Sequence, residues 1–473
     1  MSKKKRILDI PNPLLARIGA IADEAGAATY VVGGFVRDAI LGKAVKDIDI
    51  VVIGDGIAFA KLAAAKMSIR NVVTFEKFGT AMLQLDAGKV EFVGAREESY
   101  QSSSRKPEVK QATLESDLAR RDFTVNAIAA SLNKGTFGEI LDPYNGEGDI
   151  RKKILRTPLE PDRTFDDDPL RMMRAARFAS QLGFHIEADA LAAVTRNAER
   201  ISIVSMERVT EEFLKILASP RPSVGLKLLQ DTGLAKHVFP ELVDMVGVEQ
   251  RKEYHHKDVF LHTLKVVDNI STTTDDVWLR LVALAHDIAK PRTKAFKEGI
   301  GWTFHGHEDL GARMMKSIFR RLKLPMERLP YVEKLVRLHL RPMVLVSEEV
   351  TDSAIRRLLF DAGNDIDDLM KLCRADITSQ NPGRVVRYLK NYDIVLEKMK
   401  EVEEKDRLRN WQPPVRGDEI MQVCGVPPGP IVGVLKGKIE EAILEGLIPN
   451  EHDAALKYLL GIKDEIVRNS PVK

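Results

Sequence analysis

Two aspartates separated by a single residue, Asp47 and Asp49 in the run DIDIVV, are the first candidates for chemistry in this sequence. Alternate side chains of a β-strand point to the same side, so both carboxylates would face one way while Ile48 faces the core. Two carboxylates on one face can hold a pair of Mg²⁺ ions for in-line phosphoryl transfer. Glu91, between apolar residues in KVEFVG, is a candidate third carboxylate across the sheet. The alternative is that these acidic residues are solvated at strand edges.

A glycine pair precedes the two aspartates. Gly33 and Gly34 in TYVVGGFVRD leave the backbone bare, so N–H groups at the start of the following helix can face a phosphate. Arg37 lies one helical turn further on. The order of strand, glycine turn, helix and strand therefore predicts a phosphate-binding turn beside the carboxylates.

A second pattern lies between residues 255 and 376, where histidine and aspartate recur in the order H…HD…D. An adjacent His-Asp pair presents an imidazole and a carboxylate to one divalent ion, a mixed nitrogen and oxygen set suited to metal-assisted hydrolysis of phosphate esters. A transition metal such as Mn²⁺, Ni²⁺ or Fe²⁺ would suit this site. The predicted ligands are His262, His286, Asp287 and Asp376.

The other histidines of this region allow two interpretations. His305 and His307 in FHGHEDLG, with His339, can complete a second metal site or bind a substrate phosphate. A single histidine near a helix is more often a packing residue, and that interpretation is favoured for His255, His256 and His339.

The elements that must position these residues change in character along the chain. Short β-branched runs (TYVVGG, DIDIVVI, NVVTF, TAMLQLD and KVEFVGA) alternate with the helical stretch GIAFAKLAAAKM up to about residue 141, which predicts an α+β domain around a small sheet. From Pro169 onward the strands end and helical periodicity dominates, as in MERVTEEFLKILAS. We expect four domains, at residues 1–157, 158–240, 241–400 and 401–473.

Composition sets the broad class. The chain has 473 residues, too many for one core, and a formal net charge of only +3, so any RNA contact must come from local clustering of cations. Cys373 and Cys424 lie far apart, which argues against a disulfide framework or a thiolate zinc site. No apolar run is long enough to cross a bilayer, and the basic segment Lys3 to Arg6 fits a solvated tail. We expect a cytoplasmic protein.

Several motifs together resemble a known family. The run GGFVRDAILG followed by DIDIVV resembles the signature of the class II tRNA nucleotidyltransferase and bacterial poly(A) polymerase family, a branch of the polymerase-β-like nucleotidyltransferases. The segments SRKPEVK, DLARRDFTVNAIA, LDPYNGEGDI, DDPLRMMRAARFASQLGF and RISIVSMERVTEEFLKIL follow in the family's order, so the resemblance covers about residues 28 to 217. It implies an α+β head domain followed by all-α domains, and Mg²⁺-dependent addition of C, C and A to tRNA from CTP and ATP.

The resemblance also implies roles for individual residues. Gly34 and Arg37 would hold the triphosphate, Asp47 and Asp49 the Mg²⁺ ions, and Arg121 in RRDF the incoming nucleotide. An arginine fork suits phosphate and ribose oxygens. The neighbouring Arg120, Asp122 and Asn126 are either supports for this site or structural hydrogen-bonding residues.

Base selection is assigned to the segment that begins at Asp168. Asp168 and Arg171 are three residues apart at a helix start, so an acceptor and donors are neighbours. A carboxylate accepts from the amino group of cytosine or adenine, whereas uracil and guanine present a carbonyl there, a mismatch that buried sites penalise. Arg174 and Arg177 continue the spacing toward ribose and phosphates. The alternative is a helix-start carboxylate followed by solvated arginines.

One residue departs from the family's pattern. Asp167 stands where the family usually has glutamate, and its shorter side chain can alter the support of Asp168. This departure weakens the expected switch from C to A more than it weakens nucleotide binding.

The rest of the chain carries two further resemblances. The H…HD…D pattern resembles the HD phosphohydrolase superfamily, which implies phosphatase or cyclic phosphodiesterase activity on nucleotides and RNA ends. The segment from RGDEIMQVCG onward resembles a tail expected to lie against the tRNA acceptor arm, or else is a solvated helix surface. Cations suited to phosphate contact are Arg384, Arg387, Lys390, Lys436 and Lys438.

Two alternatives to CCA addition remain open. A poly(A) polymerase or a partial CC- or A-adding enzyme shares every motif, although the amphipathic C-terminal helix ending in SPVK favours CCA addition over a polymerase with a long basic tail. A hydrolase of the HD class with an RNA-binding N-terminal half is disfavoured by the intact Gly34, Arg37, Asp47 and Asp49 set. No pattern indicates an oligomeric state.

Overall fold

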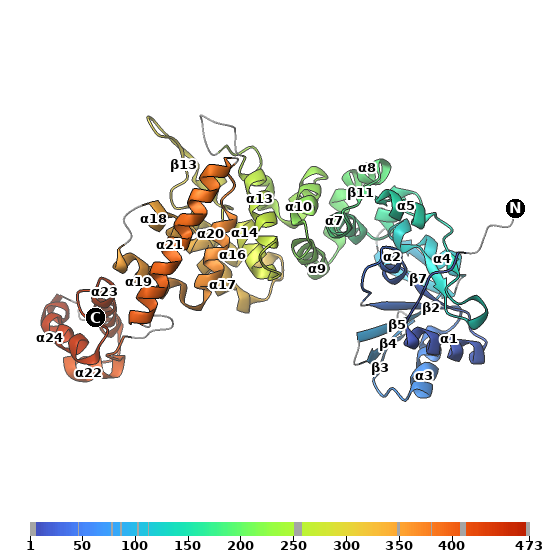
Figure 1. Ribbon diagram of the computed structural model, residues 1–473, viewed down its shortest axis with the longest axis horizontal. Coiled ribbons are helices and arrows are strands. Elements are labelled where there is room, and N and C mark those ends of the chain that lie inside the picture. Colours follow the sequence, from blue (N-terminus) through green and yellow to red (C-terminus); the bar gives the residue numbers. More distant parts are fainter. Residues whose placement is uncertain are drawn as a thin grey trace. The chain divides into compact units, whose positions relative to one another are not determined.

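The computed structural model describes residues 6–45, 47–76, 79–85, 88–101, 104–111, 113–249, 258–347, 351–379, 381–406 and 413–469. The chain divides into two compact units, Met1–Val243 and Asp244–Lys473. The first unit combines a sheet with helices and the second is built almost entirely of helices (Figure 1), as the sequence predicts. The division into four domains stays a prediction.

A seven-stranded mixed sheet organises the first unit. Its strand order is β3-β4-β5-β2-β1-β8-β9, in which only the β2–β5 pair is parallel. The strands are β1 (Thr29–Val32), β2 (Ile48–Val52), β3 (Val72–Phe75), β4 (Thr80–Leu85), β5 (Gly88–Gly94), β8 (Ala129–Ser131) and β9 (Ile140–Leu141). The five predicted strands are thus confirmed, while β8 and β9 are too short to show periodicity. Strands β6 (Arg96–Gln101) and β7 (Ser104–Gln111) form a separate pair.

Helices cover this sheet because their apolar faces pack against its apolar side chains. Helix α3 (Gly56–Met67) begins at an Asp55 cap and buries Phe59, Ala60 and Ala63 in the same core as the strand residues Ile50 and Phe92. The other helices of this part are α1 (Pro13–Ala25), α2 (Gly34–Ile40), α4 (Leu114–Ala119) and α5 (Gly146–Lys152), with the 3₁₀ turns η2 (Thr124–Asn126) and η3 (Lys134–Thr136).

The rest of the first unit is helical and grows out of the same core. Helix α7 (Leu170–Leu182) contributes Ala175, Phe178 and Ala179 to that core, so its arginines are held at the sheet. Its neighbours are α6 (Pro161–Asp167), α8 (Ala188–Asn197), α9 (Met206–Leu217), α10 (Pro222–Asp231), α11 (Ala235–Val238) and α12 (Pro240–Asp244), with η4 (Ala198–Ile203). The short strands β10 (Ile154–Leu155) and β11 (His185–Ile186) pair in parallel here, a departure from the strand-free region expected after Pro169.

The second unit packs helices from α13 (Val259–Ser271) onward. They are α14 (Val277–Ala285), α15 (Lys290–Thr293), α16 (His307–Arg321), α17 (Leu329–Leu338), α18 (Arg341–Ser347), α19 (Asp352–Ala362), α20 (Ile366–Ala375) and α21 (Pro382–Asp406), with η5 (Met326–Arg328) and η6 (Gly363–Asp365). A hairpin of β12 (Ala295–Lys297) and β13 (Gly301–Thr303) interrupts them, a second departure from the all-helical expectation.

The last three helices form a core of their own. Helices α22 (Gly417–Cys424), α23 (Pro430–Leu444) and α24 (His452–Asn469) enclose a cluster that includes Ile420, Leu435 and Leu459. Arg357 on α19 bonds to Glu445 directly after α23 at 2.6 Å and ties this cluster to the rest of the unit. None of the helices that the structure describes has the length and apolar character to span a membrane.

Candidate active sites

The turn between β1 and α2 brings the predicted phosphate-binding glycines beside the predicted metal ligands. Strand β1 is antiparallel to β2, with Val31 opposite Ile50, so the end of β1 lies beside the start of β2. Gly33 has a φ of 69°, and a Cβ there would lie 2.8 Å from Nη1 of Arg121. The positive φ therefore favours glycine at this turn, and the absence of a side chain leaves room for the end of Arg121.

Three carboxylates meet at this end of the sheet. Asp47 is exposed directly before β2, and Asp49 is half-buried on β2. Asp49 lies opposite Glu91 in the parallel register of β2 and β5, so these side chains are neighbours on one face. The structure thus places Glu91 where the sequence suggested a third carboxylate, and Ile48 packs against the core as expected.

The electrostatics of this carboxylate group favour a bound cation. Burial and the neighbouring Asp47 raise the pKa of Asp49, against the opposing effect of Arg121. Hard divalent cations take carboxylate oxygens as ligands, and a bound cation would offset both the burial of Asp49 and its repulsion by Asp47. The donor set therefore fits Mg²⁺.

A hydrogen-bond chain connects two of the predicted nucleotide-binding arginines. Arg37 donates from Nη1 to Asn126 Oδ1 at 2.7 Å, and Asn126 donates to Asp122 at 3.0 Å. Arg174 donates from Nε to the other oxygen of Asp122 at 2.7 Å. Burial opposes ionisation of Asp122, but Arg174 and Asn126 outweigh it and lower the pKa of Asp122 to about 2. Asp122 is thus ionised, and together with the Asn126 amide it positions Arg37 and Arg174.

Three guanidinium groups surround one aromatic ring. The ring centroid of Phe178 is 5.3 Å from Cζ of Arg37, 5.3 Å from Cζ of Arg174 and 4.3 Å from Cζ of Arg177. Arg177 is also 3.1 Å from Glu212, a buried carboxylate on α9 that sequence reasoning missed. Burial and the nearby Arg174 lower the pKa of Arg177. Such a concentration of cations suits a polyphosphate.

The turn between α6 and α7 holds the predicted base-reading pair. Asp168 Oδ1 accepts from the Leu170 amide at 3.3 Å, and its Oδ2 lies 3.9 Å from Arg208, a second residue that sequence reasoning missed. The buried Arg171 guanidinium donates to the carbonyl oxygens of Thr164 at 3.3 Å and of Arg120 at 2.5 Å.

Arg171 therefore braces the backbone beside the nucleotide-binding region. Arg121 and Arg120 both pair with the buried Asp117, at 3.1 Å and 2.5 Å. Asp167, which replaces the family's usual glutamate, ends α6 with Arg163 at 3.9 Å.

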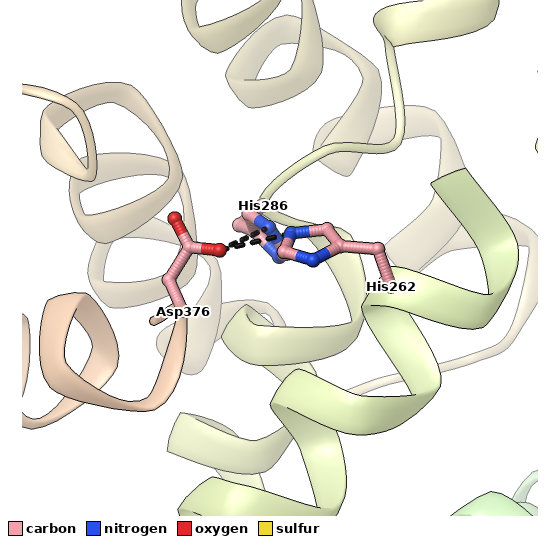
Figure 2. Close-up of side chains that lie close together, drawn as sticks. All are labelled: His262, His286 and Asp376. Atoms are coloured by element: carbon pink, nitrogen blue, oxygen red, sulfur yellow. Dashed lines mark ion pairs between the residues drawn. The ribbon is translucent and has the colours of Figure 1, made fainter. Parts of the chain in front are cut away.

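The second unit brings the H…HD…D residues together. His262 lies on α13, His286 and Asp287 follow α14, and Asp376 follows α20. Figure 2 shows both imidazoles directed at the Asp376 carboxylate, with Nε2 of His262 at 2.9 Å and Nε2 of His286 at 3.6 Å from its Oδ1. The Oδ2 atom of Asp287 is 3.2 Å from His286 Nε2 and 3.5 Å from His262 Nε2.

The second oxygen of Asp287 faces a further pair of histidines. His307 Nε2 is 3.3 Å and His339 Nε2 is 3.9 Å from Asp287 Oδ1, and these two nitrogens are 3.4 Å apart. His339, expected to be a packing residue, thus lies in the candidate second metal group, whereas His305 is exposed in the turn before α16. Asp287 stands between two groups of ligands and shares one oxygen with each.

The imidazoles are oriented for metal binding. Nδ1 of His286, His307 and His339 lies 2.7 Å from the carbonyl oxygen three residues earlier, a contact that places a proton on Nδ1 and leaves Nε2, once deprotonated, as the nitrogen that can bind a metal. His262 Nδ1 contacts Thr378 Oγ1 at 2.8 Å. Within the described part of the chain, the buried Nε2 of His286 makes no directed hydrogen bond. Such a nitrogen and carboxylate set fits a divalent transition metal.

The pKa values of two histidines in this cluster shift in opposite directions. Burial favours neutral His286, but Asp287 and Asp376 outweigh it and raise the pKa of His286 to about 9. Burial and the nearby His286 lower the pKa of His339 to about 3. Lys290 bonds to Asp287 Oδ2 at 2.7 Å and was missed, although its spacing of three residues from Asp287 in HDIAKP was a usable signal.

Some predicted residues are not joined to either site. His255 and His256 lie outside the described residues, as do the side chains of SRKPEVK. The basic residues assigned to tRNA contact lie on two helices, Arg384, Arg387 and Lys390 on α21 and Lys436 and Lys438 on α23. Lys438 pairs with Glu441 at 3.0 Å. Their role stays a prediction.

Comparison with known proteins agrees with this arrangement. Family models for the poly(A) polymerase head domain, the probable RNA and SrmB-binding site of polymerase A, and the HD domain match residues 29–156, 183–245 and 259–379. The A-adding tRNA nucleotidyltransferase of Deinococcus radiodurans is 34% identical over 357 residues, covering 72% of this chain and 78% of the relative. The multifunctional CCA protein of Ralstonia nicotianae is 35% identical over 321 residues, covering 65% and 71%.

Solved structures share the fold. The Bacillus stearothermophilus CCA-adding enzyme in complex with CTP superposes with a TM-score of 0.66 at 24% identity, covering 97% of this chain and all of the other. A tRNA nucleotidyltransferase complexed with a primer tRNA and an incoming ATP analog gives a TM-score of 0.59 at 25% identity, covering 82% and 99%. The chain therefore belongs to the tRNA nucleotidyltransferase family, in the branch that carries a poly(A) polymerase head domain and an HD domain.

Proposed function

We propose that the protein adds C, C and A to the 3′ end of tRNA from CTP and ATP without a template, releasing pyrophosphate. The observation that carries this proposal is the meeting of Asp47, Asp49 and Glu91 beside the Gly33 turn in a chain of this family. Bound Mg²⁺ would activate the attacking hydroxyl and support the departing pyrophosphate. Asp47 and Asp49 would hold these ions, with Glu91 beside them.

Binding of the nucleotide is proposed for the arginines and the glycine turn. Arg37 and Arg174, positioned through Asn126 and Asp122, would bind the triphosphate, and Arg177 would add a third cation at Phe178. Gly33 and Gly34 allow close approach of phosphate to the backbone, and Arg121 binds the incoming nucleotide. Guanidinium groups that are already oriented stabilise the charge that develops without further reorganisation.

Selection of the base is proposed for Asp168 and Arg171. Asp168 is a partly exposed acceptor at the start of α7, whose next turns carry Arg174 and Arg177 toward the ribose and phosphates. Arg171 also bonds to the Arg120 carbonyl, so it links the base-reading turn to the segment that holds Arg121. An acceptor in this position favours bases with an exocyclic amino group.

A direct assay tests this function. The protein is incubated with tRNA lacking its CCA end, with each radiolabelled NTP singly and with CTP and ATP together, and product lengths are read on a gel. CCA addition requires two residues from CTP alone and a third only when ATP is present. Addition of A alone, and only to tRNA ending in CC, would instead match the name of the Deinococcus relative, and a long A tail would indicate a poly(A) polymerase.

We further propose that the histidine and aspartate cluster hydrolyses phosphate esters of nucleotides or RNA ends with a divalent metal. Asp287 offers one oxygen to the group of His262, His286 and Asp376 and the other to His307 and His339, so these residues would hold a divalent ion in either group. Mn²⁺, Ni²⁺ and Fe²⁺ suit these ligands. Release of phosphate, measured with each metal after removal of bound metal by chelation, tests the hydrolase. Absence of release with every metal would leave the module structural.

We also propose a cytoplasmic location. Cys373 and Cys424 are both free thiols, which suits a reducing compartment. Fractionation of the cells that produce the protein checks this.

A further inference from the structure

The β12–β13 hairpin carries two exposed aromatic side chains on one face. Phe296 and Trp302 are opposite each other in the antiparallel register, 51% and 36% exposed, with ring centroids 5.2 Å apart. Thr303, one residue on, points to the other face, where it is buried and donates to the Ala295 carbonyl. Neighbouring exposed aromatic rings of this kind are characteristic of interaction surfaces.

One cation contacts this aromatic pair and two more lie near it in the chain. Lys294 Nζ lies 4.2 Å from the centroid of the Trp302 ring, and Arg292 and Lys297 are exposed nearby in the chain. Across the described residues, Arg292, Lys294 and Lys297 take part in no ion pair with a carboxylate. Glu298 is the only acidic residue between positions 290 and 304. The hairpin therefore presents uncompensated positive charge next to two aromatic rings in edge-to-face contact.

The segments that flank the hairpin contact the metal-binding cluster. On one side, Lys290 bonds to Asp287 at 2.7 Å. On the other side, the carbonyl of Phe304 contacts Nδ1 of His307 at 2.7 Å. Lys290 Nζ also lies 5.6 Å from the Phe304 ring, and Figure 1 shows the hairpin extending from the helices of this unit. The segments on either side of the hairpin therefore connect it to the candidate ligands.

We propose that the β12–β13 hairpin is a binding site for single-stranded RNA. Bases stack on Phe296 and Trp302, and Arg292, Lys294 and Lys297 pair with the phosphates. Aromatic rings interleaved with cations recognise single strands in this way because every base offers a flat face, while a duplex hides its bases. Delivery of the strand's end to the Asp287 cluster rests on the proposed hydrolase function, whereas binding itself does not.

Crosslinking of the full-length protein locates the binding site without any need for hydrolysis. The probe is a hexaribonucleotide of uridine with one 4-thiouridine, irradiated with the protein in the presence of EDTA, and the crosslinked peptide is identified by mass spectrometry. We expect crosslinks within residues 290–304. Crosslinks confined to other segments would overturn the proposal.

Affinity measurements with hairpin variants test the role of stacking. Trp302→Leu, which keeps apolar bulk without a stacking surface, should weaken binding of the hexanucleotide roughly tenfold, and Trp302→Tyr should restore most of it. The control Ile300→Ser alters a residue of the same hairpin that is 74% exposed and should leave affinity unchanged. Equal affinity of Trp302→Leu and wild type, or a wild-type dimer that Trp302→Leu dissociates, would overturn RNA binding in favour of no site or of a protein interface.

A third measurement separates the hairpin from the hydrolase. For an oligoribonucleotide ending in a 2′,3′-cyclic phosphate, Trp302→Leu should raise KM roughly tenfold, while kcat/KM for a cyclic mononucleotide stays unchanged. If wild type hydrolyses neither substrate, the hydrolase function fails and the crosslink still decides the hairpin. If Trp302→Leu lowers kcat/KM equally for both substrates, Trp302 supports the metal-binding cluster and the proposed RNA-binding role of the hairpin is refuted.

Discussion

The two candidate sites of this protein hold charge in opposite ways. In the first unit the metal ligands are carboxylates at the open end of a sheet, with Asp47 exposed and Asp49 half-buried. In the second unit the ligands are mainly imidazoles between helices, and His286 and Asp287 are each only 1% exposed. One site is open to solvent before substrate arrives, and the other is closed around its ligand atoms.

This difference follows from the chemistry that each site has to perform. Mg²⁺ keeps several water ligands and is usually completed by substrate phosphates, so an open pair of carboxylates beside fixed arginines suits it. A transition metal prefers a preformed nitrogen and oxygen set. A buried cluster whose Nε2 lone pairs point inward should depend on its ion for stability, whereas the carboxylate site should not.

The largest expected effect is loss of nucleotide addition in Asp49→Ala. Removing this ligand should lower kcat/KM for CTP and ATP by more than about a hundredfold, since metal ions contribute several kcal/mol to such transition states. Metal-dependent hydrolysis should be unchanged because its ligands lie in the other unit. Asp9→Asn, an exposed carboxylate of the same unit, serves as the control. Addition above a few per cent of wild type would refute the assignment of Asp49.

The reverse experiment removes an imidazole. His286→Ala should abolish metal-dependent phosphate release and lower the bound metal measured by mass spectrometry, while CTP and ATP incorporation stays normal. His305→Ala, which removes an exposed histidine near the cluster, is the matched control and should keep its metal. Metal content equal to wild type in His286→Ala would contradict the proposed ligands.

The same comparison can be made with metal alone. A metal present at about a hundred times its Kd should stabilise the helical unit by about 2.7 kcal/mol, so its unfolding transition should fall when EDTA is added. The transition of the first unit should not move. Calorimetry that resolves the two transitions checks this, and an equal shift of both would show that the sites do not differ as proposed.

A smaller effect is expected in the choice of base. In Asp168→Ala the acceptor for the cytosine or adenine amino group is gone, so discrimination against UTP and GTP should shrink by about 1–3 kcal/mol. Arg171→Ala should weaken both correct nucleotides and also destabilise the turn, because Arg171 bonds to two backbone carbonyls. Arg37→Ala should weaken all four NTPs alike. A uniform fall in kcat/KM for Asp168→Ala would show that the base is selected elsewhere.

The smallest expected effect is a pH dependence of stability in the first unit. Because the folded pKa of Asp122 is lowered to about 2, its contribution of about 2 kcal/mol is complete above pH 5 and is lost as pH falls from about 4 toward 2. Asp122→Asn should therefore be less stable than wild type at pH 7, with a gap about half as large at pH 3. Urea unfolding measures it, with the exposed Asp189→Asn as the control. A gap that does not narrow would rule out Asp122 as the titrating group.

Much of both sites is predictable because it is local. The spacing of Asp47 and Asp49, the Gly33 turn and the helix at residues 56–67 follow from periodicities of two and 3.6 residues, and the adjacent His286 and Asp287 carry their chemistry in the sequence itself. The short strands β8, β9, β12 and β13 escaped notice since two or three residues show no period.

Other features depend on which distant residues meet. The α+β character of the first unit, the helical character of the second and the family resemblance could all be inferred from the sequence. Only the tertiary structure placed Glu91 beside Asp49, joined Asp122 to Arg174, and chose His339 over His305 for the group around Asp287. Periodicity reports only the direction of a side chain relative to its own strand or helix. Strand register and helix packing, which set the contacts between elements, depend on the whole core.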